Sequence, residues 1–425
     1  ELWFPMGSLP GHARRGGVRR RLSRRAKCGI PVRGVDMEPN RSGLRWLVVA
    51  ACATALSSCG SGGSGAPGDR VATYNAGIAV SFVDYSTARA PVVVEALAEQ
   101  PFDLLCVQEL WREQDWQGLV AATATALPYT FRRPNEPDPE GGGGCPSELS
   151  DPLEACTRAS CDVPVDQLTS CVLDRCGAEL DRIATEDPAC FGCLAANIGK
   201  TIDEILAACG PDSSGGSFAF DGSFGTGILS STPLAETDSL LLEATTNRRA
   251  VLYARVEDTP IGPVHAFCTH LTANLSNVPY TGPFGSWAEE QSAQIAAMIE
   301  YVGQKATTPG TVLLLGDFNT GPAAGNAVAE LPANYAQLVA AGFANPYAAQ
   351  PDAECSFCLS NPLNGGGADV GVLIDHVLLR GDIAVTADGF QFLRGTIEVD
   401  AEGVGRVTTA YSDHYGVALT IAPLR

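Results

Sequence analysis

Positive charge is scarce over most of this chain. Its 425 residues include 28 lysines and arginines against 48 aspartates and glutamates, and 11 of the 28 fall within residues 1–58, which hold only 3 acids. The remainder therefore carries 17 basic against 45 acidic side chains, a net charge of −28. Such a surface has no general attraction for nucleic-acid backbones or anionic lipids. An anionic substrate would have to be held locally, by a few arginines and a bound cation.

Apolar runs long enough to cross a membrane are also lacking at the N-terminus. Residues 47–56 are apolar, but the run is too short to span a bilayer comfortably. It follows two arginines and precedes Leu56-Ser57-Ser58-Cys59, so residues 37–58 are predicted to be a secretory signal. The last four residues resemble a bacterial lipoprotein box, which would make Cys59 the lipidated start of an exported envelope or secreted protein. The alternative is an ordinary signal peptide followed by an incidental cysteine.

The composition predicts one large folded region. Residues 1–36 are rich in arginine, and we expect them to be a non-native or disordered extension upstream of a start at Met37. Residues 59–69 include GSGGSGAPG, which is typical of a flexible tether. With 45% hydrophobic residues in the chain, residues 70–425 are expected to fold. A loop and a cysteine-rich insertion should interrupt this domain at residues 132–216, and no internal repeat is evident.

Cysteines are concentrated in that insertion. Eight of them lie within a 65-residue stretch, at positions 145, 156, 161, 171, 176, 190, 193 and 209. In an oxidising compartment this density predicts disulfides, although the sequence does not choose among the possible pairings. Zinc binding is the alternative for Cys190-x-x-Cys193 and for Cys355-x-x-Cys358. Cys106 and Cys268 lie inside apolar strand-like runs and are expected to be buried free thiols.

Strand-like and helix-like segments are mixed along the folded region. Strands are predicted at 71–75, 103–107, 227–230, 250–256, 264–269, 312–315, 377–379 and 417–421, and helices at 88–99, 165–176, 201–208 and 289–302. There is no strict strand–helix alternation. The pattern favours an α/β sandwich with mixed or antiparallel sheets.

Polar residues stand at the ends of several of these strands. They are Asn75, Glu109, His270, Asp317 and Asn319 after strands, and Asp375, Asp413 and His414 before strands. Antiparallel neighbours bring the end of one strand beside the start of the next, so all of them can gather at one edge of the core. Each residue alone could be an ordinary turn or surface residue, but together they predict a site.

The chemistry of this set is consistent with phosphoester hydrolysis. Carboxylate and amide oxygens without cysteine suit a hard divalent cation, Mg²⁺ or Mn²⁺, with Ca²⁺ also possible. Hydrolysis of a phosphate ester needs such a cation, an oriented water and groups that steady the phosphoryl oxygens. Histidines beside acids can supply charge stabilisation or proton transfer near neutral pH.

Six short motifs carry a resemblance to a known superfamily. They are Thr73-Tyr74-Asn75, Val107-Gln108-Glu109, Thr269-His270-Leu271, Gly316-Asp317-Phe318-Asn319, Ile374-Asp375-His376 and Ser412-Asp413-His414. In this order they resemble the endonuclease/exonuclease/phosphatase superfamily, which includes deoxyribonuclease I, abasic-site nucleases, neutral sphingomyelinases and inositol-phosphate 5-phosphatases. The resemblance covers about residues 70–131 and 217–425. It implies a four-layer α/β sandwich, with two packed mixed or antiparallel sheets flanked by helices and a small disulfide-rich helical insertion.

The resemblance also implies roles for the acids and amides. Glu109 would be the principal metal ligand with Asn75 beside it, and Asp413 would complete the metal shell or a second metal position. Asp317 would orient or deprotonate the attacking water. Asn319 would hold the phosphate.

The histidines and one arginine receive implied roles in the same way. His414 would contact the scissile phosphate and be oriented by Asp375, and His270 would steady the phosphate or assist the leaving group. Arg249 is a possible phosphate contact, with an ordinary surface arginine as the alternative. His376 is expected to be structural.

The implied function is metal-dependent hydrolysis of phosphoester bonds by in-line attack of water. The substrate is expected to be a nucleic acid or a phospholipid head group, in the manner of a nuclease or of a sphingomyelinase or phospholipase C. No basic stripe or aromatic series supports nucleic acid. Membrane attachment is expected through Cys59, and no obligate protein partner is inferred. The alternative function is a non-catalytic surface-binding lipoprotein that retained the fold. The insertion is expected to form a helical cap beside the active-site edge, or else to be only a stabilising element.

Overall fold

The computed structural model describes residues 69–136, 143–213, 216–385 and 389–424. The chain divides into two units, residues 1–63 and 64–425, and every described residue belongs to the second. The expectations for the signal segment, for Cys59 and for most of the tether lie outside the described residues. Among the described helices, none is long and apolar enough to span a membrane.

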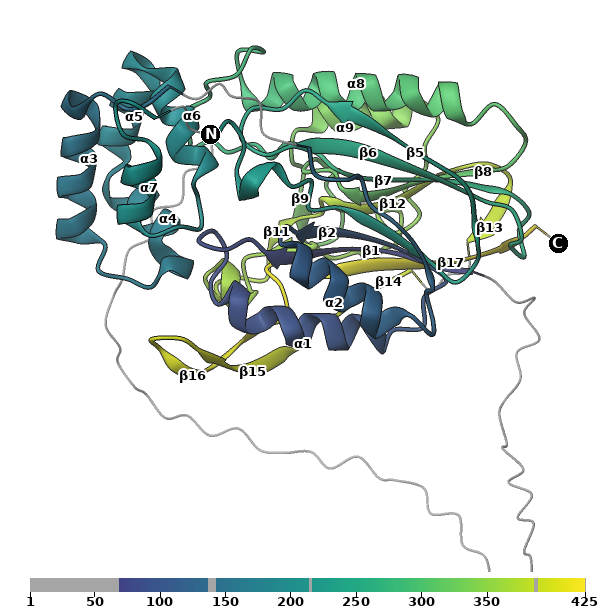
Figure 1. The fold of residues 1–425 in the computed structure, drawn as a ribbon. Helices are drawn as coiled ribbons and strands as arrows, with labels where there is room; N and C mark the ends of the chain where they lie inside the picture. Colours follow the sequence, from purple (N-terminus) through teal and green to yellow (C-terminus); the bar gives the residue numbers. More distant parts are fainter. Residues whose placement is uncertain (1–68, 137–142, 214–215, 386–388, 425) are drawn as a thin grey trace, which may run out of the picture. The chain divides into compact units, whose positions relative to one another are not determined.

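Two sheets form the centre of the second unit (Figure 1). The larger sheet has the order β13 (Ile383–Val385), β17 (Gly416–Pro423), β1 (Asp69–Ile78), β2 (Leu104–Leu110), β4 (Gly227–Ser230) and β3 (Tyr129–Phe131), with β14 (Phe390–Phe392) also paired to β17. The smaller sheet has the order β12 (Asp375–Arg380), β8 (Thr311–Asp317), β7 (Val264–His270), β6 (Arg249–Val256) and β5 (Leu234–Leu242). Both sheets contain parallel and antiparallel pairs.

The sheets pack face to face over a shared apolar core. Val71 and Ile228 of the larger sheet belong to the same buried cluster as Leu252 and Leu313 of the smaller sheet. These strands read as continuous apolar runs because each is covered on both faces. The opposite faces of the sheets therefore need covering too.

Helices cover the outer face of each sheet, as Figure 1 shows above and below the strands. On the larger sheet, α1 (Ser86–Ala98) and α2 (Glu113–Thr123) bury residues that include Val93, Leu97 and Leu119. On the smaller sheet, α8 (Trp287–Lys305) and α9 (Pro332–Ala340) pack through a second cluster. The predicted four-layer α/β sandwich is confirmed.

Two short sheets lie outside these layers. One contains β10 (Phe357–Cys358), β11 (Gly371–Val372) and β9 (Ala327–Val328), and the other is the hairpin of β15 (Thr396–Ala401) and β16 (Gly405–Ala410). Neither was predicted from the sequence. Strands of two residues leave no periodic signal, but Thr396–Ala401 does alternate polar and apolar residues, a strand signal that sequence reasoning missed.

The cysteine-rich insertion forms a group of five helices between β3 and β4, which we call the cap and define as residues 145–210. Its helices are α3 (Ser147–Ser160), α4 (Val165–Arg175), α5 (Gly177–Glu186), α6 (Pro188–Ala196) and α7 (Ile202–Ala208). Four disulfides cross-link them, pairing Cys145 with Cys190, Cys156 with Cys176, Cys161 with Cys171, and Cys193 with Cys209. The predicted disulfides are confirmed, and the zinc alternative for Cys190 and Cys193 is wrong because both sulfurs are consumed.

Two further disulfides lie outside the cap. Cys355 pairs with Cys358, so the zinc alternative for this motif is also wrong. Cys106 on β2 and Cys268 on β7 form a disulfide between the two sheets, with a Cα–Cα distance of 5.5 Å. The expectation of free thiols at these two positions is wrong. Their strands face each other across the shared core, a contact that no local sequence pattern encodes.

The disulfide between the sheets should stabilise the fold more than the local one. Replacing both Cys106 and Cys268 by alanine should lower the free energy of unfolding by about 2–4 kcal/mol, because this bond closes a long loop of the unfolded chain. The sequence separation is 162 residues, against 3 for Cys355 and Cys358. The double alanine variant of the latter pair, also buried, is the control and should lose much less. Urea denaturation of the oxidised proteins measures both, and equal losses would contradict the prediction.

Candidate active site

Strand register places three of the predicted site residues in one row across the smaller sheet. His270 ends β7 and lies beside Asp317 at the end of the parallel strand β8, and Asp375 begins the antiparallel strand β12 opposite Asp317. Gly316 permits this alignment, because it has φ 156° and a Cβ there would lie 2.1 Å from the carbonyl oxygen of Thr269. The row forms one side of the site.

The larger sheet supplies the other side. Asn75 on β1 donates hydrogen bonds from Nδ2 to Glu109 Oε1 on β2 at 3.1 Å and to Asp317 Oδ2 at 2.9 Å. One amide therefore connects the two sheets across the site. Its Oδ1 accepts from the backbone nitrogen of Gly77 at 3.0 Å. Gly77 has φ 57°, and a Cβ at this position would lie 2.3 Å from Asp413 Oδ1, so the close approach of Asp413 requires glycine.

Two site residues have an unfavourable backbone conformation. Glu109 has φ 57° and Asn319 has φ 49°. The left-handed region costs a non-glycine residue roughly 1–3 kcal/mol and is held only where the surroundings enforce it. At Asn319 the enforcing contacts are visible, because its backbone nitrogen donates to Asp317 Oδ1 and its Nδ2 donates to the carbonyl oxygen of Leu271, both at 2.9 Å.

The Asp317 carboxylate is buried among other charges. Its exposed fraction is 1%. Burial and the neighbouring Asp375 carboxylate raise the pKa of Asp317 to about 7, and His414 and the hydrogen bond from Asn75 oppose the shift. A carboxylate with a pKa near neutrality can exchange a proton at physiological pH.

His414 and Asp375 form a buried pair. His414 Nδ1 lies 2.8 Å from Asp375 Oδ2, which fixes the imidazole so that Nε2 lies 3.9 Å from the carboxylate oxygens of both Asp317 and Asp413. Burial alone would lower the pKa of His414, but the acids Asp375, Asp413 and Asp317 raise it well above its ordinary value. The imidazole is therefore expected to be protonated near neutral pH.

His270 has the opposite character. It is 3% exposed, and burial together with the charges of Arg249 and His414 lowers its pKa well below the ordinary value. Its Nε2 lies 3.5 Å from Asp317 Oδ2, and its Nδ1 makes no hydrogen bond to any described residue. His270 is thus a neutral imidazole with one nitrogen still able to bind a ligand.

Arg249 is buried without a full set of partners. Its exposed fraction is 7%, and within the described ranges neither Nε nor Nη1 finds a hydrogen-bond acceptor. The guanidinium lies 5.8 Å from the ring centroid of Trp111. Burial lowers its pKa, while Glu109 and Asp317 oppose that shift. An unsatisfied buried guanidinium is costly, so this position favours an anionic ligand.

These groups line one cleft of about 430 Å³. Its walls include Glu109, Arg249, His270, Asp317, Asn319, Asp413 and His414. Asn75 and Asp375 are not on the wall but hydrogen bond to residues that are. The structure thus brings together all nine residues that the sequence predicted, and the convergence on one edge of the core is observed. Their chemical roles stay predictions.

Glu109 and Asp413 provide the donor chemistry that a divalent cation requires. Burial and the nearby charge of Asp413 raise the pKa of Glu109. A buried acid whose ionised form a neighbouring acid destabilises fits a bound cation, and oxygen donors are those that Mg²⁺ and Mn²⁺ prefer. Asn75 is oriented with its nitrogen toward the acids, so in this arrangement it positions Glu109 through a hydrogen bond.

A second grouping of potential ligand atoms comprises Asp317, Asp375 and His414, which lie within 4.8 Å of one another. We assign this group to proton and charge chemistry, because the imidazole already hydrogen bonds to Asp375 and its raised pKa opposes metal binding.

His376, expected to be structural, packs away from these groups. Its Nε2 lies 2.9 Å from the carbonyl oxygen of Thr320, and its Nδ1 lies 3.0 Å from Asn345 Nδ2. Its contacts are those of a core histidine.

Sequence reasoning missed the residues that hold the site's loops. Arg89 on α1 is fully buried and donates to the carbonyl oxygens of Gly77 at 2.5 Å and Tyr411 at 2.7 Å, which ties together the segments after Asn75 and before Asp413. Ser412 Oγ donates to the carbonyl oxygen of Asn75 at 2.8 Å. An arginine on the apolar stripe of a helix was the available signal for Arg89.

Replacing Asp317 by asparagine should stabilise the metal-free fold. The folded protein retains a proton on Asp317 up to pH of about 7, whereas the unfolded chain releases it near the ordinary value of 3.8. The free energy of unfolding should therefore fall as pH rises across this interval, and the substitution removes that loss. In EDTA, the advantage of Asp317→Asn should grow from pH 4 to 7 and then level off.

Urea denaturation at a series of pH values measures this effect. Asp238→Asn is the control, because a hydrogen bond from Lys305 lowers the pKa of Asp238 and its removal should cost a little stability. If Asp317→Asn gave no gain at pH 8, the buried charge would not be a destabilising one.

No curated protein sequence matches the chain significantly. Solved structures resemble it at low identity. Sphingomyelinase C from Streptomyces griseocarneus is 18% identical, with 84% of this chain and 99% of that chain covered and a TM-score of 0.47. A double mutant of beta toxin from Staphylococcus aureus with bound magnesium ions is 12% identical (83% and 99% covered, TM-score 0.47). Truncated TDP2 from Caenorhabditis elegans is 14% identical (83% and 97%, 0.45).

A family model provides the stronger evidence. The model of the Endonuclease/Exonuclease/phosphatase family matches residues 72–414, from the strand that carries Asn75 to His414 at the end of the site. The match spans most of the 425 residues. The chain therefore belongs to the Endonuclease/Exonuclease/phosphatase family.

Proposed function

We propose that this protein is an exported phosphodiesterase that depends on a divalent cation, Mg²⁺ or Mn²⁺. Family membership supports phosphoester hydrolysis in general. The observation that carries the finer proposal is the pairing of a near-neutral acid with a protonated histidine. Asp317, with a pKa of about 7, and His414, with a raised pKa, face each other across 3.9 Å in one cleft.

Asp317 is the base in this proposal. Asn75 and the backbone nitrogen of Asn319 each donate to one of its carboxylate oxygens, which fixes the direction in which the carboxylate can accept a further proton. A water held beside it would lose its proton to Asp317 as its oxygen attacks phosphorus. The pKa of about 7 suits this exchange at neutral pH.

His414 serves the phosphoryl group. Asp375 accepts from Nδ1, so the proton on Nε2 is directed into the cleft. The imidazolium can stabilise negative charge on a phosphoryl oxygen and donate its proton to the departing oxygen. Asp375, buried and hydrogen bonded through one oxygen, acts by positioning this ring.

Arg249, His270 and Asn319 are proposed to bind the phosphate. Arg249 offers unsatisfied donors, neutral His270 offers a hydrogen bond, and Asn319 presents its amide at the cleft wall. Glu109 and Asp413, supported by Asn75, would hold the cation. When bound, the cation supplies positive charge that neutralises the phosphate and favours attack on phosphorus.

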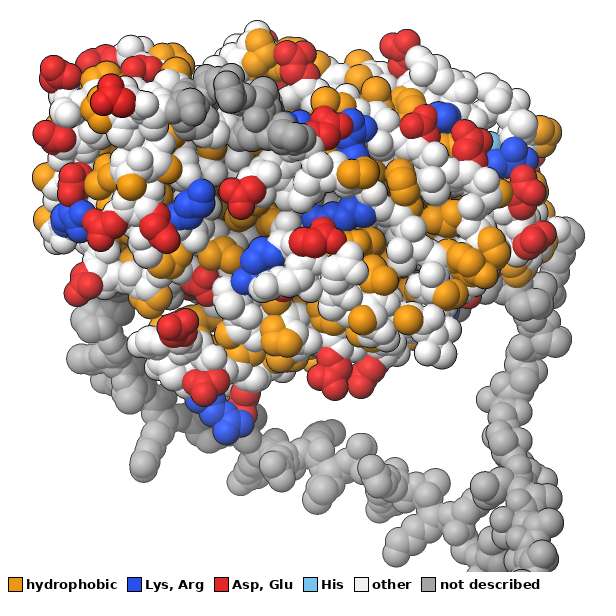
Figure 2. Space-filling view, in the orientation of Figure 1, with side chains coloured by type: hydrophobic (Ala, Val, Ile, Leu, Met, Phe, Trp, Pro, Cys, Tyr) orange, Lys and Arg blue, Asp and Glu red, His pale blue; other side chains and the backbone are white. Residues whose placement is uncertain are grey.

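A phospholipid head group, or another substrate without a long run of negative charges, fits the charge distribution of this protein better than nucleic acid. On the face of the molecule drawn in Figure 2, lysine and arginine side chains are scattered and not gathered into a stripe. The net charge of −28 beyond residue 58 also opposes a long polyanion. Incubation with plasmid DNA and with sphingomyelin, each with Mg²⁺, would separate the two substrate classes.

Export is proposed from the predicted signal and from the six disulfides among the described residues, since such bonds form in oxidising compartments. Lipidation of Cys59 is part of the proposal, and mass measurement of the mature N-terminus tests it. The rival function, a non-catalytic binding lipoprotein, would need no buried acid–histidine pair. Preservation of every predicted catalytic position argues against it.

Activity should require the cation, His414 and Asp375. EDTA should abolish hydrolysis of a soluble diester such as bis(p-nitrophenyl) phosphate, and added Mg²⁺ should restore it. His414→Ala and Asp375→Asn should each lower kcat by roughly 10²- to 10⁴-fold, because the charged donor is lost or misdirected. Asp238→Asn, at a half-buried position of β5 outside the cleft, is the control and should retain wild-type rates. Hydrolysis that survived both EDTA and His414→Ala would refute the proposal.

Arg249 should contribute to binding of the transition state. Arg249→Ala should lower kcat/KM by roughly 10²- to 10³-fold, because a preorganised donor to the phosphate is removed. Arg249→Lys should recover part of this loss, since it keeps the charge and loses the planar fork. Arg255→Ala, on the same strand but paired with Glu257 away from the cleft, is the control. Equal kinetics for the two alanine variants would assign Arg249 to structure alone.

A further inference from the structure

A second cavity, distinct from the catalytic cleft, lies between the cap and the main domain and is partly open to solvent. About 100 Å³ of space lies among α3, α4, α6 and α7 and the neighbouring loops of the main domain. Apart from the threonines at 157, 169 and 246, every residue on its wall is apolar. An apolar wall of this kind offers no hydrogen-bond partners to water and can bind a hydrocarbon.

The helices around this cavity are incompletely packed. None of the residues of α7 is buried, although Ile202, Ile205 and Leu206 line the cavity. On α4, Val172 and Leu173 line it and are only half-buried. Half-buried apolar side chains on two helices that face one space leave contact area for a hydrocarbon ligand.

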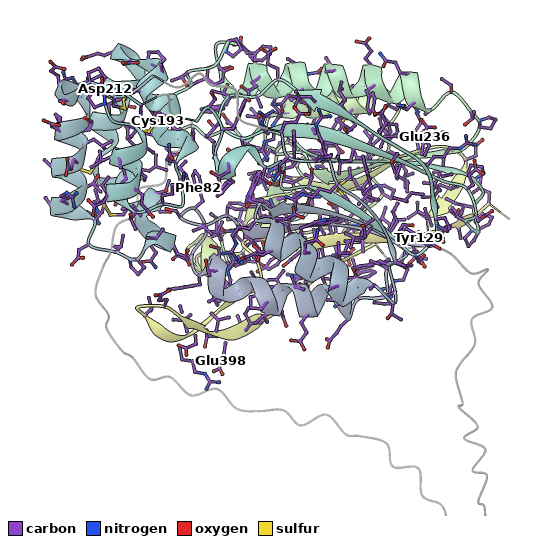
Figure 3. All side chains as sticks on the ribbon, viewed as in Figure 1. Phe82, Tyr129, Cys193, Asp212, Glu236 and Glu398 are labelled. Carbon is purple, nitrogen blue, oxygen red and sulfur yellow. A yellow bond between two sulfur atoms is a disulfide. The ribbon has the colours of Figure 1, made fainter. Side chains whose placement is uncertain are left out.

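The cavity and the catalytic cleft share walls. Phe82 and Leu275 line both. Phe82 follows β1, the strand that carries Asn75, and Leu275 follows β7, which ends at His270. Figure 3 shows Phe82 where the cap adjoins the main domain. A ligand whose polar end occupied the cleft could therefore extend an apolar end past these two residues into the cap.

Hydrogen bonds and disulfides hold the cap against the loop that bears Phe82. Ser81 Oγ lies 2.7 Å from Thr169 Oγ1 and accepts from the Thr169 backbone nitrogen at 3.0 Å. Ser170 Oγ lies 3.4 Å from the carbonyl oxygen of Phe82. Four disulfides oppose collapse of the helices onto the empty space. A preformed cavity binds a chain without a large ordering cost.

We propose that the cap cavity binds the end of a hydrocarbon chain of a lipid phosphodiester whose phosphate lies in the catalytic cleft. This inference rests on the proposed function and names its substrate class. The charge of the cap agrees, because residues 145–210 carry 12 acidic and 4 basic side chains, which disfavours a nucleic-acid strand there. The cap would thus select substrates by their apolar part, and the cleft would act on the phosphate.

Filling the cavity should reduce activity on lipid and spare a soluble diester. Ala195→Phe on α6 and, independently, Val172→Phe on α4 place a ring toward the space. Each should lower kcat/KM on sphingomyelin in mixed micelles by about tenfold or more, mainly through KM, because each occupies the volume of the chain. Rates on bis(p-nitrophenyl) phosphate should stay at the wild-type level. Ala207→Phe, at an exposed position of α7 that does not line the cavity, is the matched control and should match wild type on both.

A binding measurement separates this inference from the proposed function. The fluorescent fatty acid cis-parinaric acid, which contains no phosphate, should bind the wild-type protein and the Ala207→Phe variant and bind at least about tenfold more weakly to Ala195→Phe. Such binding would support the cavity even if no diester were hydrolysed, which would defeat only the proposed function. Hydrolysis of sphingomyelin that both cavity variants leave unchanged, or parinaric acid binding that they leave unchanged, would overturn the inference.

Discussion

Four buried or half-buried carboxylates, those of Glu109, Asp317, Asp375 and Asp413, converge where the two sheets end, and the need to compensate their charge governs the site. Burial makes each ionised carboxylate costly, and proximity adds repulsion. Asn75 donates hydrogen bonds to both Glu109 and Asp317. His414 lies 2.8 Å from Asp375 and 3.9 Å from both Asp317 and Asp413. Glu109 and Asp413 are compensated less: Glu109 accepts one hydrogen bond from Asn75, and the imidazole of His414 lies 3.9 Å from Asp413, which supports the proposal that a cation binds there. The same unfavourable charges that reduce the stability of the empty fold give Asp317 a pKa near neutrality.

The sequence predicted this edge well because strand ends are local features. Each polar residue follows or precedes an apolar run, and a register set by parallel and antiparallel pairing then brings His270, Asp317 and Asp375 into one row. The layered architecture followed from the same runs.

What the sequence could not predict depends on contacts between distant segments. The Cys106–Cys268 disulfide joins strands of different sheets, and Arg89 binds carbonyl oxygens from two separate loops. Trp111, which lies under Arg249, was likewise visible only in three dimensions.

The cap adds a second, apolar cavity beside the cleft. The two sheets position the groups proposed to act on a phosphate, and the cross-linked helices line a space that is almost entirely apolar and shares Phe82 and Leu275 with the cleft. A disulfide-bonded insertion can keep such a space open because the bonds replace the packing that a larger apolar core would supply. The insertion lies between β3 and β4, and β4 pairs with β2, which carries Glu109, so the proposed sites of substrate selection and of chemistry lie on adjoining strands.

The central claim is that water, oriented by Asp317, attacks the phosphorus of a diester. Hydrolysis of bis(p-nitrophenyl) phosphate in ¹⁸O-labelled water with Mg²⁺, followed by mass spectrometry of both products, tests this directly. The account predicts one ¹⁸O atom in the phosphate product and none in the released nitrophenol. Label in the nitrophenol, or no turnover by protein that binds Mg²⁺, would contradict it.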